Sequence, residues 1–187
     1  METRGLFHTF FLLFISLFYT SSSFAQDSTE ANSREQSVAL AKSRTFALEQ
    51  VNDSLSVLCL QTGQQVNKWK LPYPVYQFQT GDVDGDGTVE ALVGVVKSTR
   101  FYPEKGRRIF IFKNYHGKIR AMWMGSKLGG ILHDFRFTDG KIRSLEATTD
   151  GHFVVAEYRW AHFGVEFCRF LATNVSLEEA KQSFNAD

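Results

Sequence analysis

The sequence predicts an all-β domain made of antiparallel hairpins, followed by one short helix at its C-terminal end. Apolar and polar residues alternate with period two in a series of short runs from residue 44 onward, which is typical of half-buried strands. Turn signals that contain glycine separate the runs. The 18 Phe, 6 Tyr and 3 Trp suit pleated surfaces better than helices. We therefore expect two to three propeller-like blades, or a sandwich or barrel.

The first 43 residues lie ahead of this domain. Arg4 precedes an apolar run over 6–19, and small residues then lead to Ala25, which is the order of a cleavable secretory signal peptide. The run is shorter than the ~20 residues that a spanning helix needs, so an uncleaved anchor is the less favoured interpretation and no membrane span is expected after cleavage. Residues 26–43 are polar and small and form a leader segment. The protein is expected to be secreted or periplasmic.

Residues 44–187 are expected to form a single β domain with a terminal helix. This length can bury a core without disulfides. Cys59 and Cys168 could pair in an oxidising compartment, or remain two separate buried thiols. The formal net charge of +1 gives no reason to expect a nucleic-acid partner or an anionic-lipid partner.

About eleven short strands follow one another along the domain. Asn52-Asp53-Ser54, Asp139-Gly140 and Asp150-Gly151 are among the turns between them. Because no helix-length periodic segment lies between the strands, a parallel α/β sheet is not expected. In chain order the predicted strands are 45–51, 55–61, 65–71, 76–80, 90–98, 108–114, 118–125, 131–138, 141–148, 152–160 and 165–171.

The one convincing helix follows the last strand. Ser176 is placed to cap it, and Glu179 completes a capping box. Leu177, Ala180 and Phe184 then fall on one face. We expect the helix to pack against the edge of the sheet.

The segment 82–90 places carboxylates at alternate positions, with glycines that let the chain curl. Carboxylates this close repel one another without a cation, and hard oxygen ligands favour calcium. An EF-hand loop would need a carboxylate at its twelfth position, where this chain has Val93. The alternative is a solvated Asp-Gly turn that binds no metal. The predicted ligands are the side chains of Asp82, Asp84, Asp86 and Glu90 and the backbone carbonyl of Thr88, with water completing the shell.

This loop resembles the FG-GAP or VCBS repeat family, whose blades form integrin-type β-propellers. The residues that match are Asp82, Asp84, Asp86, Gly87, Glu90, Leu92, Val93 and Gly94. The resemblance implies a propeller-like blade with a structural calcium ion in the loop between two strands, a module of extracellular adhesion and carbohydrate-associated proteins. It covers about fifteen residues, has Glu90 where Asp is commoner, and lacks a second acidic loop; ~45-residue units would give two or three blades.

Aromatic residues near the last predicted hairpin form a candidate binding face. It consists of Tyr158, Trp160, His162 and Phe163, which are amphipathic or apolar residues close to a turn. Packing of these rings in the core is the other interpretation. The leading hypothesis is an exported, calcium-stabilised β module that binds a protein or a glycan.

Two other functions remain open from the sequence. His133, Asp134 and His152 could act as acid and base in an extracytoplasmic hydrolase. No G-x-S-x-G segment supplies a nucleophile, so an enzyme is the less favoured class. The chain could also be a purely structural envelope protein.

Overall fold

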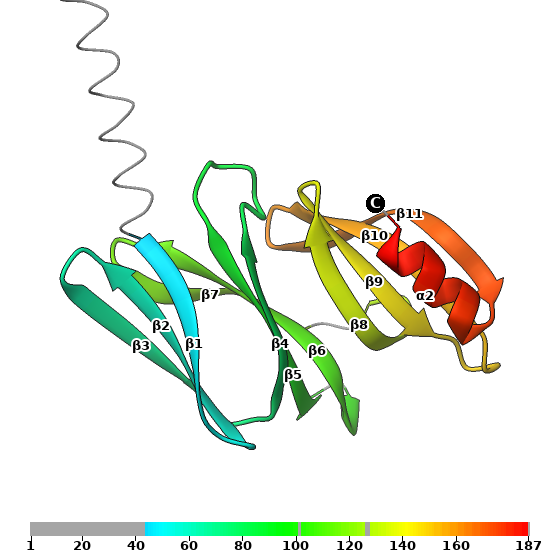
Figure 1. Ribbon diagram of the computed structural model, residues 1–187, viewed down its shortest axis with the longest axis horizontal. Coiled ribbons are helices and arrows are strands. Elements are labelled where there is room, and N and C mark those ends of the chain that lie inside the picture. Colours follow the sequence, from blue (N-terminus) through cyan, green and yellow to red (C-terminus); the bar gives the residue numbers. More distant parts are fainter. Residues whose placement is uncertain (1–43, 101, 126–127, 187) are drawn as a thin grey trace, which may run out of the picture. The chain divides into compact units, whose positions relative to one another are not determined.

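The computed structural model describes residues 44–100, 102–125 and 128–186 (Figure 1). The predicted signal peptide and polar leader both lie outside the described residues. Within the described part of the chain, no helix is long and apolar enough to cross a membrane. All the described residues belong to one compact unit.

The described residues form three antiparallel sheets and one short helix, which confirms the predicted all-β class (Figure 1). Each sheet is a meander of consecutive strands, and none closes into a barrel. Sheet A contains β1 (Arg44–Asn52), β2 (Leu55–Thr62) and β3 (Gln65–Leu71). Sheet B contains β4 (Val75–Gly81), β5 (Glu90–Thr99), β6 (Tyr102–Tyr115) and β7 (Lys118–Met124). Sheet C contains β8 (Ile131–Thr138), β9 (Lys141–Ala147), β10 (Phe153–Ala161) and β11 (Gly164–Val175), and α2 (Leu177–Asn185) follows it.

Sheet B lies between two hydrophobic cores, and alternate residues of the same strands enter each. Ala91, Val93 and Val95 of β5 belong to the core shared with sheet A, whereas Leu92 belongs to the core shared with sheet C. On β6, Phe110 and Phe112 join the first core and Ile109 and Ile111 the second. β5 is therefore buried on both faces, which explains its nearly continuous apolar sequence.

Amide side chains join the edges of neighbouring sheets. Gln77 Nε2 on β4 donates to the carbonyl of Phe135 at 2.6 Å, and the Phe137 amide donates to Gln79 Oε1 at 2.6 Å. These two bonds satisfy backbone groups of β8 at the edge of sheet C. A Cβ on Gly81 would lie 2.2 Å from a ring carbon of Phe137, so the two sheets meet here at a distance that only glycine allows.

The terminal helix covers the face of sheet C that points away from sheet B, rather than the edge of the sheet as predicted, because Ala180 and Phe184 pack on the inner strands β9 and β10. Ser176 Oγ accepts from the Glu179 amide and Glu179 Oε2 accepts from the Ser176 amide, so the predicted capping box is confirmed. Ala180 and Phe184 are buried against Leu145 and against apolar residues of β10 and β11. Arg143 is 6% exposed and donates to the carbonyls of Phe184 and Ala186, which have no partner inside the helix.

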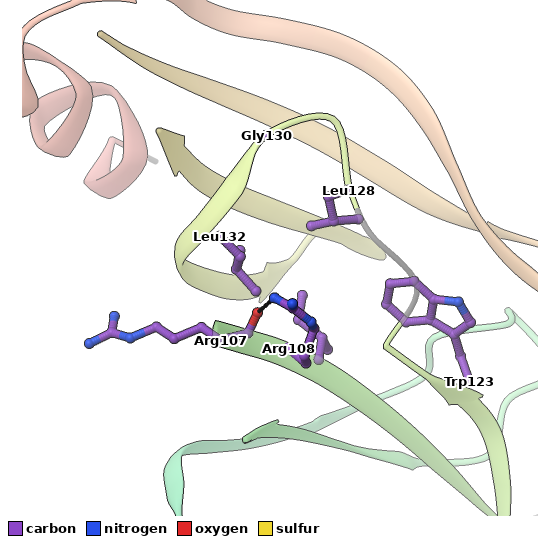
Figure 2. Close-up of a pocket in the computed structure, with 7 residues that line it drawn as sticks. Arg107, Arg108, Trp123, Leu128, Gly130 and Leu132 are labelled. Carbon is purple, nitrogen blue, oxygen red and sulfur yellow. Dashed lines mark hydrogen bonds between the residues drawn. The ribbon is translucent and has the colours of Figure 1, made fainter. Parts of the chain in front are cut away.

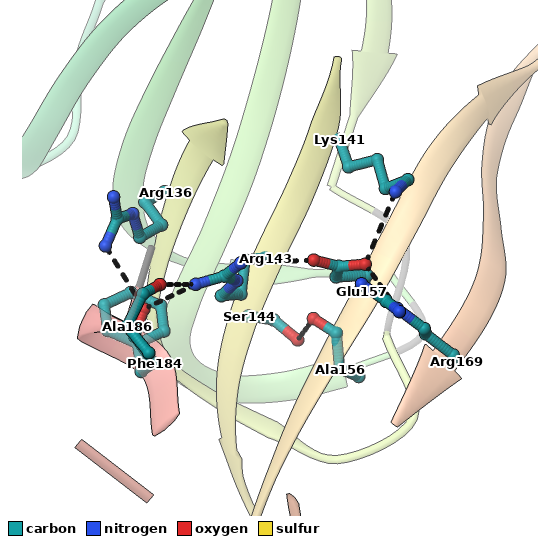
Figure 3. A network of polar contacts seen from close by, with 9 residues as sticks. All are labelled: Arg136, Lys141, Arg143, Ser144, Ala156, Glu157, Arg169, Phe184 and Ala186. Carbon is teal, nitrogen blue, oxygen red and sulfur yellow. Dashed lines mark hydrogen bonds and ion pairs between the residues drawn. The ribbon is translucent and has the colours of Figure 1, made fainter. Parts of the chain in front are cut away.

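Arg143 also belongs to an ion-pair network centred on a buried carboxylate, Glu157 (Figure 3). Glu157 Oε1 lies 3.3 Å from Arg143 Nη2, and Glu157 Oε2 lies 2.8 Å from Arg169 Nε and 3.6 Å from Lys141 Nζ. Hydrogen bonding from Arg169 holds the pKa of Glu157 below its usual value. The network therefore links three strands of sheet C to the end of α2.

Two strands are longer than the sequence predicts. β6 begins at Tyr102 rather than at residue 108, because its first half pairs with the end of β5 despite Pro103 and Gly106. β11 continues to Val175, and the β10–β11 register shifts show that it accommodates extra residues.

Of the two open possibilities for the cysteines, neither holds in full: Cys59 is a buried free thiol, and Cys168 is a free thiol that is half-buried.

Candidate functional site

The acidic loop connects the end of β4 to the start of β5. Gly85 and Gly87 have φ values of 76° and 82°, a left-handed conformation that glycine adopts without strain. A Cβ at either position would meet nothing within 4 Å, so the need for glycine is conformational and not steric. The two glycines turn the chain around the aspartates.

Three aspartates converge in this loop. One carboxylate oxygen from each of Asp82, Asp84 and Asp86 lies within 4.8 Å of the other two. Asp82 Oδ1 accepts from the Gly85 amide at 2.8 Å, and its Oδ2 accepts from the Gly87 amide at 3.0 Å. Asp84 and Asp86 each accept a backbone amide two residues ahead. The carboxylates therefore shape the loop as well as facing one another.

Glu90 points into the same loop from the first position of β5. It is 0% exposed, its Oε2 accepts from the Val83 amide at 2.9 Å, and its Oε1 lies 3.2 Å from Thr88 Oγ1. Burial raises the pKa of Glu90 to about 7, and the nearby charges of Asp84 and Asp86 act in the same direction. A bound cation would favour the ionised form of all four carboxylates.

The donor set fits calcium. It offers oxygen atoms alone, from the converging carboxylates of Asp82, Asp84 and Asp86, and calcium takes six to eight such ligands. The predicted ligand Glu90 is not part of this group of converging oxygens, and its carboxylate accepts from the Val83 amide and the Thr88 hydroxyl. Asp82 and Asp84 are partly buried and Asp86 is exposed, so water can complete the shell. Thr88, the other predicted ligand, lies in the loop between Asp86 and Glu90.

The residues of the predicted binding face divide between the core and the surface. Trp160 packs against the core between sheets B and C, whereas His162 is exposed at the β10–β11 turn with φ 52°. Tyr158 is 6% exposed, and Phe163 at the same turn is 89% exposed. Tyr158 and Phe163 both line one cavity of about 420 Å³, and Trp160 and His162 do not line it.

A second cavity of about 300 Å³ lies next to the first, and Gly129 lines both. Phe167 lines the first cavity and Phe170 the second, and these two β11 residues are 45% and 54% exposed. We call the two cavities with the rings of Phe163, Phe167 and Phe170 the aromatic groove. Phe167 and Phe170 were not predicted from the sequence, because the register shifts of β11 decide which of its residues face solvent.

A buried polar cluster forms the floor between the two cavities. Glu146 Oε1 accepts from Ser144 Oγ at 2.5 Å and from Tyr158 Oη at 2.9 Å, and Glu146 Oε2 accepts from the Gly130 amide. Burial raises the pKa of Tyr158 to about 12, so its hydroxyl stays protonated and donates. A Cβ on Gly130 would lie 2.8 Å from the Ala147 carbonyl. The cluster therefore fixes the backbone at the groove rim instead of offering a free acid or base.

A smaller cavity lies between β6 and the start of β8 (Figure 2). It measures about 20 Å³, which is room for a single water molecule. In Figure 2 the Arg107 side chain points away from the other labelled residues, and Arg108 Nη1 donates to the Arg107 carbonyl at 2.8 Å. This cavity is too small to be a ligand site.

The candidate hydrolase residues do not form an acid–base pair in the described structure. His133 is exposed on β8, and its ring contacts Phe153 at a centroid distance of 5.2 Å. Asp134 Oδ1 accepts from the Phe135 amide, and His152 Nδ1 lies 3.4 Å from Asp150 Oδ2 in an exposed turn. Among the described residues, no hydrogen bond or ion pair joins His133 to Asp134 or His152.

No family model, curated protein or solved structure matches the chain. The resemblance to FG-GAP or VCBS repeats therefore depends on the loop residues alone and stays a prediction.

Proposed function

We propose that this chain is an exported β module that is stabilised by calcium and binds a protein partner through its aromatic groove. The observation that carries the proposal is the convergence of Asp82, Asp84 and Asp86 beside the buried carboxylate of Glu90. Export is supported by the order of charged, apolar and small residues in 1–25.

The position of the acidic loop supports a structural role for the metal. Glu90 is the last residue of the loop and the first residue of β5, the strand that is buried on both faces. A cation that holds Glu90 and the aspartates together fixes the start of this strand, and so supports both hydrophobic cores.

The chemistry of the aromatic groove favours a protein over a glycan. Phe163, Phe167 and Phe170 expose rings without hydrogen-bonding groups, and Ile131 at the rim of the second cavity is 55% exposed. The acceptors of Glu146 in the floor are already used by Ser144, Tyr158 and Gly130. Such a surface recognises apolar side chains of a peptide segment, whereas sugar hydroxyls need free polar groups.

Binding can be tested by panning the chain against a random peptide library and, in parallel, against an array of glycans. We expect enriched peptides with apolar side chains, and we expect Phe163→Ser to weaken their binding without lowering stability, because the ring is already in solvent. Val66→Ser is the matched control, since Val66 is 53% exposed on sheet A. Binding of glycans alone, or of peptides that tolerate Phe163→Ser and Phe170→Ser, would contradict the proposal.

A further inference from the structure

The end of the β5–β6 hairpin that lies opposite the acidic loop is strongly basic. Residues 97–108 contain five cationic side chains and one acidic side chain, Glu104. The cations are Lys97, Arg100, Lys105, Arg107 and Arg108. They come together because β5 pairs with β6 in the register Lys97 to Gly106 and Val96 to Arg107.

Two of these cations are held in place by aromatic rings. Lys97 Nζ lies 4.3 Å from the ring centroid of Tyr73, and Arg107 Cζ lies 4.6 Å from the ring centroid of Tyr76. Arg107 Nη1 also donates to the His133 carbonyl. Among the described residues, no ion pair involves Lys97, Lys105 or Arg107. The charges of Lys97 and Arg107 are therefore fixed in position, and no ion pair within the described part of the chain neutralises any of the three cations.

The positive charges of the basic end lie too far from the acidic loop to interact strongly with its carboxylates. β5 has 10 residues, and at about 3.3 Å per residue it places its two ends about 30 Å apart. Charges in solution are screened over about 8 Å at physiological ionic strength. An anionic surface that approaches the hairpin end therefore meets the cations and not the aspartates, and the opposite charges at the two ends orient the molecule toward it.

We infer that the β5–β6 hairpin end, with Lys97 and Arg107 as its fixed cations and the exposed Lys105 beside them, binds the phosphate headgroups of an anionic membrane surface. A membrane that meets the hairpin end-on can contact Lys97 on one face of sheet B and Lys105 and Arg107 on the other, because successive residues of β5 and β6 point to opposite faces. The acidic loop then points away from the membrane, and the interaction does not depend on what the aromatic groove binds.

The test is sedimentation of the chain, begun at Gln26 so that it contains the whole compact unit, with vesicles of phosphatidylglycerol and phosphatidylcholine. Pure phosphatidylcholine vesicles are the uncharged comparison. We expect binding to the mixed vesicles alone, weakened by added salt. The variant Lys105→Gln with Arg107→Gln should bind about 30-fold more weakly, because each cation near an anionic surface contributes about fivefold.

The matched control removes two cations from sheet A, Lys68→Gln with Lys70→Gln, and should bind like the parent. Circular dichroism and thermal unfolding confirm that both double variants are folded. Equal binding to charged and uncharged vesicles, or full binding by the hairpin variant, would overturn the inference. It would also be overturned if a soluble sulfated polysaccharide bound the hairpin while the mixed vesicles did not, because the ligand would then not be a membrane.

Discussion

Removing charge from the acidic loop should change stability in opposite directions with and without calcium. The perturbation is the double variant Asp84→Asn with Asp86→Asn, which keeps side-chain oxygens for the backbone amides of Asp86 and Thr88 but removes two charges. The parent loop without metal holds three like charges, whereas the variant holds one. The variant should therefore be the more stable protein in a chelator and the less stable one in calcium.

The magnitude follows from the spacing of the carboxylates. Two charges 4.8 Å apart repel by roughly 0.9 kcal/mol in a water-like dielectric. Three such pairs are lost in the double variant, so the gain in a chelator is about 2.5 kcal/mol and falls with added salt. Calcium about 100-fold above its dissociation constant would stabilise the parent by about 2.7 kcal/mol. Each shift corresponds to a change of about 5–10 °C in Tm for a domain of this size.

The assay is thermal unfolding of parent and variant, each in calcium and in a chelator. Asp139→Asn is the matched control, because Asp139 lies in an ordinary Asp-Gly turn between β8 and β9 with φ 51°. Its Tm should be the same as that of the parent under both conditions. Equal Tm values of the parent with and without calcium would refute the metal site. A variant that is less stable than the parent in the chelator would refute the claim that the aspartate carboxylates repel one another in the metal-free loop.

Three further predictions concern the sheets. Gly81→Ala should lower the free energy of unfolding by about 1–3 kcal/mol in chemical denaturation, because its Cβ would collide with the Phe137 ring. A change in this free energy below the error of the measurement would show that the two sheets can move apart there without loss of stability. Arg143→Ala should lower the free energy of unfolding by about 3–5 kcal/mol, because it leaves the Glu157 carboxylate buried with fewer partners. Arg159→Ala breaks an exposed ion pair with a carboxylate and should lower it by at most about 1 kcal/mol. Equal losses in these two variants would contradict the burial argument. Because the folded pKa of Glu157 is lowered, its ion pairs should stabilise the fold fully above about pH 4.5 and lose this effect as the pH falls further, and a Glu157→Gln variant should show a smaller acid loss in the same titration.

Short-range patterns accounted for most of the elements. The period-two runs identified the eleven strands of the described residues, and Ser176 with Glu179 located the helix start, because side-chain alternation and capping depend on neighbours within a few residues. The same holds for the acidic loop, whose aspartates lie two residues apart and whose glycines adopt the left-handed conformation locally. A local sequence can specify a local shape.

The groove required contacts that are distant in the sequence. Phe167 faces solvent because an extra residue in β11 shifts its pairing with β10, and a register shift is a property of two strands. Glu146 reaches Tyr158 and the Gly130 amide only after β8, β9 and β10 have paired. In the sequence of β9 alone, Glu146 looks like an exposed strand residue.

By itself the sequence determined the strands, the capped helix and the loop of converging carboxylates, since each depends on residues close together in the chain. The tertiary structure decided that β5 is buried on both faces, that Gln77 and Gln79 join two sheets, and which aromatic rings remain exposed. Alternation shows which residues share a face, but whether that face meets water or another sheet depends on long-range packing.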